Sequence, residues 1–128
     1  MKKILIVEDE PASIKLMSAI LRGAGYQVVT AQDAIGAVST AKRERPDLMV
    51  LDVNLPGGDA LVVIKRLSTM GAMTPLVVVS ASEANRQRAV EAGADAFLLK
   101  PLDQATFLAA VKGALGEVEV PAPVAPPE

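Results

Sequence analysis

Four short apolar runs in this sequence end at polar residues whose types are suited to chemistry. In chain order these polar residues are Glu8 and Asp9, then Asp52, then Ser80, then Lys100. If the fold brings the three carboxylates together, they repel one another unless a proton or a cation lies between them. A hard divalent cation with oxygen ligands fits best, because such a site leaves room for water and phosphate. The set therefore predicts a Mg²⁺ site.

A cation, carboxylates, a hydroxyl and an ammonium group together suit phosphoryl transfer. The cation and Lys100 would neutralise phosphoryl oxygens, Ser80 would hydrogen-bond another, and one carboxylate would attack phosphorus in line. Asp52 is the better nucleophile because it stands alone after its run, whereas Glu8 and Asp9 are adjacent and better disposed as ligands. Taken singly, an acidic residue after a strand is often only a helix cap. The four strand ends taken together favour a phosphoryl-transfer site over helix caps.

Composition excludes several other kinds of site. The 128 residues contain no cysteine and no histidine, so disulfides, Cys/His zinc sites and Ser-His-Asp nucleophiles are ruled out. The net charge of -2 argues against a domain built to hold nucleic-acid backbones. No apolar run approaches the roughly 20 residues of a membrane span, and the start of the chain does not resemble a signal peptide. We expect a cytoplasmic protein with no direct contact with nucleic acid or membrane.

The elements that must position these residues are short strands. The apolar runs cover residues 4–7, 48–51, 76–79 and 96–99, are too short for helices, and do not alternate with polar residues. Such runs are typical of strands buried on both faces of a parallel sheet. A fifth segment, residues 27–31, is more polar and suits an edge.

Stretches with helical spacing separate the strands. They run from about residues 11–23, 33–45, 59–70, 83–92 and 103–115, with Pro11 in a first turn and Asp103 as an N-cap. The stretch 83–92 offers only Ala89 and Val90 for burial, so we expect it to be the most loosely held helix.

Strictly alternating strands and helices predict an α/β fold. We expect a flavodoxin-like, doubly wound, five-stranded parallel sheet in the order 2-1-3-4-5 with five helices, whose strand ends gather the polar residues at one edge. Residues 1–116 would form this domain. Residues 117–128 contain four prolines and would be a disordered tail or the stub of a linker.

Four motifs in this order resemble those of the response-regulator receiver domain, the phospho-accepting module of two-component signalling, here of the single-domain type. They are Glu8-Asp9, Leu51-Asp52-Val53-Asn54-Leu55-Pro56-Gly57, Val79-Ser80-Ala81 and Lys100-Pro101. The resemblance implies that Asp52 accepts a phosphoryl group from a histidine kinase or phosphotransfer protein. It also implies that Mg²⁺ is held by Glu8, Asp9, Asp52 and the backbone carbonyl of Asn54.

The resemblance assigns further roles. Ser80 and Lys100 would contact the phosphoryl group, and the Lys100-Pro101 bond would be cis. Phe97 occupies the switch-aromatic position, although it also reads as a core aromatic, while Asn54 and Ser82 match positions that tune hydrolysis. Ser80 is expected to be free to reorient, so that phosphorylation pulls the fourth helix and lets Phe97 turn inward. A downstream protein would bind the face of the fourth helix, fifth strand and fifth helix.

Three alternatives remain open. A Mg²⁺-dependent aspartyl-phosphate hydrolase would use a second Asp two residues after the nucleophile, where this chain has Asn54. A flavin-binding domain would need a phosphate-cradling loop in place of Glu8-Asp9-Glu10, whose charges repel phosphate. The chain can also be the receiver part of a longer multidomain regulator. The expectation is a binding and signalling module rather than an enzyme.

Overall fold

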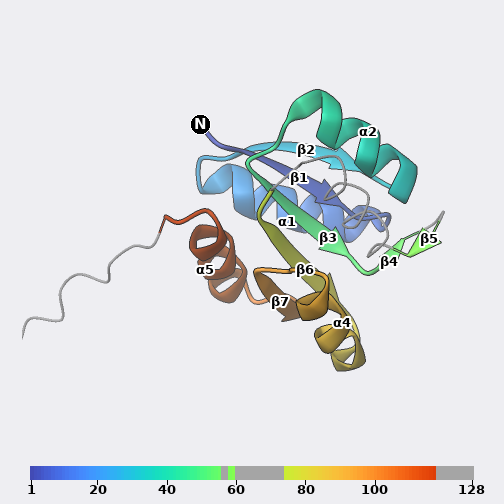
Figure 1. Ribbon diagram of the computed structural model, residues 1–128. Helices are drawn as coiled ribbons and strands as arrows, with labels where there is room; N and C mark the ends of the chain where they lie inside the picture. The colour runs from blue at the N-terminus through green and yellow to red at the C-terminus, as the bar shows by residue number, and fades with distance from the viewer. Residues whose placement is uncertain (56–57, 60–73, 118–128) are drawn as a thin grey trace, which may run out of the picture.

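A five-stranded parallel sheet forms the centre of the molecule (Figure 1). The computed structural model describes residues 1–55, 58–59 and 74–117. The strands lie in the order β2-β1-β3-β6-β7, which confirms the order predicted from the sequence. Their bounds are Lys3–Val7 for β1, Gln27–Ala31 for β2, Leu48–Asp52 for β3, Leu76–Ser80 for β6 and Ala96–Leu99 for β7. Beyond β3, Asn54–Leu55 (β4) and Gly58–Asp59 (β5) pair antiparallel.

Helices cover both faces of the sheet. The described residues contain α1 (Pro11–Gly23), α2 (Ala34–Glu44), α4 (Arg86–Glu91) and α5 (Gln104–Ala114), and a short 3-10 helix, η1 (Glu83–Asn85), leads into α4. Side chains of α1 and α5 pack in one apolar cluster, and those of α2 and α4 pack in the other. Of the helix predicted for residues 59–70, Asp59 lies in β5 and the remainder falls outside the described residues.

Local side-chain chemistry sets where several helices begin. Asp33 Oδ1 accepts a hydrogen bond from the Gly36 amide at 2.6 Å, and Asp103 Oδ2 accepts one from the Thr106 amide at 2.9 Å. Both are N-caps, which satisfy amides that the first turn leaves unpaired. Pro11 opens α1, where its missing N–H costs nothing. These starts confirm the predicted ones to within a residue.

The strands alternate their side chains between the two clusters, and β1, β3 and β6 are buried on both faces, as predicted. β7 is less buried than predicted, because Phe97 is buried but Ala96 and Leu98 are half-buried and Leu99 is 40% exposed. An edge strand has a neighbour on one side only. Val90 was also expected to be buried and is 60% exposed, because Ala89 is the buried residue of the short helix α4.

The end of the described chain is tied to the start of the sheet. The Tyr26 hydroxyl donates to Glu117 Oε1 at 2.7 Å, and Lys2 Nζ lies 3.4 Å from Glu117 Oε2. Burial, the hydrogen bond and the charge of Glu117 together raise the pKa of Tyr26 to about 12. Side-chain contacts thus reach one residue past the predicted domain end at residue 116, and residues 118–128 lie outside the described range. Across the described ranges, we find no helix with the length and apolar character needed to cross a membrane.

Candidate functional site

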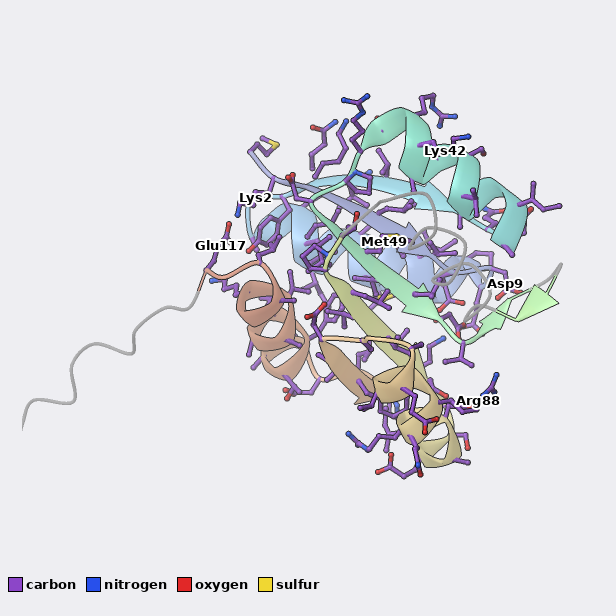
Figure 2. The ribbon with its side chains drawn as sticks, viewed as in Figure 1. Lys2, Asp9, Lys42, Met49, Arg88 and Glu117 are labelled. Atoms are coloured by element: carbon purple, nitrogen blue, oxygen red, sulfur yellow. The ribbon has the colours of Figure 1, made fainter. Side chains whose placement is uncertain are left out.

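The ends of parallel strands position the acidic residues. Val7 pairs with Leu51 in adjacent strands, so Glu8, which follows β1, and Asp52, which ends β3, leave the sheet side by side. Figure 2 shows Asp9 at this same edge, beyond the arrowheads of the strands. The apolar runs that precede these residues are buried, so the backbone that carries the carboxylates is held by the core.

Glu8, Asp9 and Asp52 form the acidic cluster. Each offers a carboxylate oxygen, and these atoms all lie within 4.8 Å of one another. Glu8 is fully buried and Asp52 is 6% exposed, whereas Asp9 is exposed. Hard oxygen donors with one side open to water are the chemistry that suits Mg²⁺, which keeps several water ligands in protein sites. The cluster therefore fits the predicted cation.

Lys100 joins two members of the acidic cluster. Its Nζ atom lies 2.7 Å from Glu8 Oε1 and 3.1 Å from Asp52 Oδ2. Burial and the neighbouring Asp52 raise the pKa of Glu8 above its ordinary value, although the Lys100 hydrogen bond opposes this. Burial lowers the pKa of Lys100, but its bonds to Glu8 and Asp52 outweigh burial and raise it. The ammonium group of Lys100 thus already compensates part of the negative charge of Glu8 and Asp52.

Glu8 also shapes the turn between β1 and α1. Its Oε2 atom accepts hydrogen bonds from the Asp9 amide at 3.1 Å and the Glu10 amide at 3.2 Å. Both Glu8 oxygens therefore have protein donors, one from Lys100 and the other from the backbone. Asp9 is the exposed carboxylate of the cluster.

Ser80 lies at the end of β6 and is fully buried. Its hydroxyl donates to the Ser82 carbonyl at 3.2 Å and accepts from the Ser82 amide at 3.0 Å and from Asn85 Nδ2 at 2.9 Å. The expectation that Ser80 is free to reorient was therefore wrong, because three hydrogen bonds fix its oxygen. No sequence pattern indicates the Asn85 contact, which depends on the path of the loop.

Phe97 is also held more firmly than expected. It is 8% exposed and packs in the cluster that contains Val78 and Ala89. The Arg86 guanidinium lies 4.8 Å from the centre of its ring, and Arg86 Nε is 2.7 Å from Glu83 Oε2. Phe97 is thus already turned inward in this structure. Sequence reasoning missed Arg86, whose only signal was an acidic residue three positions earlier on an exposed helix.

The remaining predicted positions surround the same edge. Asn54 is the first residue of β4, two positions after Asp52, and the Lys100–Pro101 peptide bond is cis. Ser82 Oγ accepts a hydrogen bond from the Ala84 amide at 3.2 Å and so caps η1. Pro56 and Gly57, part of the motif around Asp52, lie outside the described residues.

A groove of about 430 Å³ opens beside Lys100, between α1 and the segment that follows β7. Leu16 and Met17 line it from α1, and Pro101 and Leu102 line it from the opposite wall. Leu16 is 51% exposed. An apolar surface is therefore available next to the acidic cluster.

Comparisons with known proteins agree on one family. Residues 4–112 match the model of the response regulator receiver domain. The chain is 39% identical over 124 residues to the alkaline phosphatase synthesis transcriptional regulatory protein PhoP of Bacillus subtilis, covering 95% of this chain and 52% of that protein. It is 36% identical over 115 residues to the transcriptional regulatory protein PrrA of Mycobacterium tuberculosis, covering 88% of this chain and 49% of that protein. The chain spans about half the length of these curated relatives.

Solved structures of response regulators and receiver domains have the same fold as this chain. A putative response regulator from Chloroflexus aurantiacus superposes with a TM-score of 0.85 at 28% identity, covering 90% of this chain and 98% of that one. The receiver domain of a sensor histidine kinase from Pseudomonas aeruginosa, with a magnesium ion coordinated in its active-site cleft, gives 0.82 at 29% identity over 90% and 98% of the two chains.

Proposed function

The chain belongs to the response regulator receiver domain family of two-component systems, and from this premise we propose that Asp52 is its phosphoryl acceptor. The observation that carries the proposal is the position of the Asp52 carboxylate, beside Lys100 and within 4.8 Å of carboxylate oxygens of Glu8 and Asp9. Nucleophile, charge-neutralising ammonium and candidate metal ligands thus lie at one strand edge, where ligands of open α/β sheets bind.

In the proposed reaction, an Asp52 oxygen attacks the phosphorus of a phosphohistidine. The new O–P bond forms as the N–P bond breaks, and the electron pair leaves with the imidazole nitrogen. Lys100, already 3.1 Å from Asp52 Oδ2, is positioned to neutralise negative charge on the phosphoryl oxygens. Ser80 would donate a hydrogen bond to another of these oxygens.

The acidic cluster is proposed to hold Mg²⁺ through Glu8, Asp9, Asp52 and the backbone carbonyl of Asn54. The ion would neutralise charge on the transferring group. The donor set of the cluster and the magnesium of the Pseudomonas aeruginosa receiver support this assignment. Among these residues, exposed Asp9 presents its carboxylate to solvent, and buried Glu8 orients Lys100.

The phosphoryl donor would be a histidine kinase or phosphotransfer protein that docks in the cytoplasm. The groove between α1 and the segment after β7 supports a protein donor, because it places apolar contact area directly beside Lys100.

The downstream partner is expected to be a protein bound by α4, β7 and α5, where Val90 and Leu99 are exposed. We propose no nucleic-acid contact for this chain, whose net charge is -2. Its chemistry would be its own phosphorylation and slow hydrolysis.

The test is phosphorylation with acetyl phosphate and Mg²⁺, followed by intact-mass measurement. We expect one added phosphoryl group, stable to acid and labile to base, and no addition when Mg²⁺ is chelated. Asp52→Asn should abolish the addition, whereas the control Asp47→Asn, before β3 at the opposite end of the sheet, should retain it. Equal incorporation by Asp52→Asn would refute the assignment.

A further inference from the structure

The hydroxyl of Ser80 is fully used in this structure. A serine hydroxyl has one proton to donate and two lone pairs to accept with. The proton goes to the Ser82 carbonyl, and the lone pairs accept from the Ser82 amide and from Asn85 Nδ2. Ser80 can therefore donate to a phosphoryl oxygen only after giving up its bond to the Ser82 carbonyl.

Asn85 uses its side chain in an unusual way for its position. It precedes the first residue of α4, where asparagine normally caps a helix through its side-chain oxygen. Asn85 makes no such capping bond, and its amide nitrogen instead donates to Ser80 Oγ at 2.9 Å. This contact spans five positions and joins the start of α4 to the end of β6.

The held Ser80 faces the same side of the sheet as Phe97. Val78 pairs with Phe97, and Ser80 lies two residues after Val78, so strand alternation places all three on one face. The residue after Asn85 is Arg86, whose guanidinium lies over the Phe97 ring. The Asn85 amide therefore links the hydroxyl at the strand end to the segment that covers the aromatic ring.

We propose that Asn85 is a positioning residue that holds Ser80 in the unphosphorylated arrangement. This inference rests on the proposed function and names a regulatory contact of the same site. When a phosphoryl oxygen recruits Ser80, the hydroxyl leaves its place in the loop, and the Asn85 amide loses its acceptor. The start of α4, with Arg86, is released by the same event. The η1–α4 segment thus has two competing arrangements, one with Asn85 bound to Ser80 and one with Ser80 bound to the phosphoryl group. The phosphoryl group shifts the equilibrium between them only by its difference in affinity for the two.

The experiment titrates beryllium fluoride in the presence of Mg²⁺, as a mimic of the phosphoryl group, and follows backbone amide signals of residues 80–91 by NMR. Asn85→Ala removes the donor and should tighten binding by about 3- to 10-fold, the factor that one hydrogen bond between neutral groups contributes. The control Gln87→Ala removes an exposed amide from the same helix and should bind as the parent does. Unchanged or weaker binding by Asn85→Ala would overturn the proposal.

Two further variants sharpen the test. In a Ser80→Ala background, Asn85→Ala should have no effect on binding, because the hydroxyl that it restrains is gone; a persisting effect would contradict the proposal. Asn85→Asp has the same size but offers the Ser80 hydroxyl an acceptor, so binding should weaken; tighter binding would also contradict it. Parent-like binding by Asp52→Asn would instead refute the proposed function, so the two failures are distinguishable.

Discussion

The acidic cluster with Lys100 and the η1–α4 segment lie at the same edge of the sheet but are held in different ways. Glu8, Asp52 and Lys100 follow or end strands of the sheet, and both carboxylates are nearly or fully buried. The six-residue helix α4 buries only Ala89, and polar contacts secure the loop before it. Figure 1 shows α4 at the end of the molecule away from α2.

Because the two regions are anchored differently, the η1–α4 segment can move while the carboxylates and Lys100 keep their geometry. Catalytic groups need a fixed geometry, which strand ends anchored in a core provide. Segments that change with a ligand come from the least stable parts of a fold, where few apolar contacts must be broken. The acidic cluster is therefore suited to bind a cation and a phosphoryl group. The η1–α4 segment is suited to change conformation when they bind.

The largest effect should come from breaking the strand-end region at Lys100. Lys100→Met leaves Glu8 and Asp52 without their shared ammonium group, and we expect a loss of about 2–4 kcal/mol in the free energy of unfolding, as for a partly buried ion pair that loses one partner. Urea unfolding measures it. Lys42→Met, at an exposed position of α2, is the control and should unfold like the parent (Figure 2). A loss no greater than the control's would show that the cluster does not need this cation.

A smaller effect of opposite sign is expected at Asp9. Asp9→Asn removes an exposed charge within 4.8 Å of two other carboxylates, which should stabilise the metal-free protein by about 1 kcal/mol. The same change should weaken Mg²⁺ binding. Thermal unfolding with and without Mg²⁺ measures both, with exposed Glu91→Gln as control. An unchanged Mg²⁺ affinity would remove Asp9 from the metal site.

The smallest change in stability is expected in the η1–α4 segment. Arg86→Ala removes the guanidinium over the Phe97 ring but leaves the apolar cluster intact, so the unfolding transition should shift less than in Asp9→Asn. The ring and backbone NMR signals of Phe97 should nevertheless move, because its cover is gone. A large loss of stability would mean that this segment is as well anchored as the strand ends, and the contrast between the two regions would fail.

Much of this arrangement was predictable from the sequence because it follows from the topology of the backbone. Buried runs identified the strands, and parallel strands must end at one edge, so the gathering of Glu8, Asp52 and Lys100 needed no knowledge of side-chain conformation. The N-cap Asp103 could be found because capping depends on neighbours within the same turn.

The features that the sequence did not predict depend on side-chain packing instead of backbone topology. Three features depend on how one short loop and one short helix pack on the sheet. They are the hydrogen bonds of Ser80, the contact of Arg86 with the Phe97 ring, and the exposure of Val90. Periodicity over so few residues carries little information about which side chain faces inward. The contacts that this loop and this short helix make were therefore beyond sequence reasoning.

The bond between Tyr26 and Glu117 separates two ends of the molecule. Glu117 also contacts Lys2, just before β1, so the chain leaves the domain at the amino-terminal edge of a parallel sheet (Figure 2). Asp52 lies at the carboxyl-terminal edge, about 16 Å away by the rise of a five-residue strand. Glu117 and Asp52 therefore lie at opposite ends of the sheet. If Asp52 is modified as proposed, the effect would reach Glu117 through the fold of the domain rather than by direct contact, because the whole length of β3 lies between the two edges.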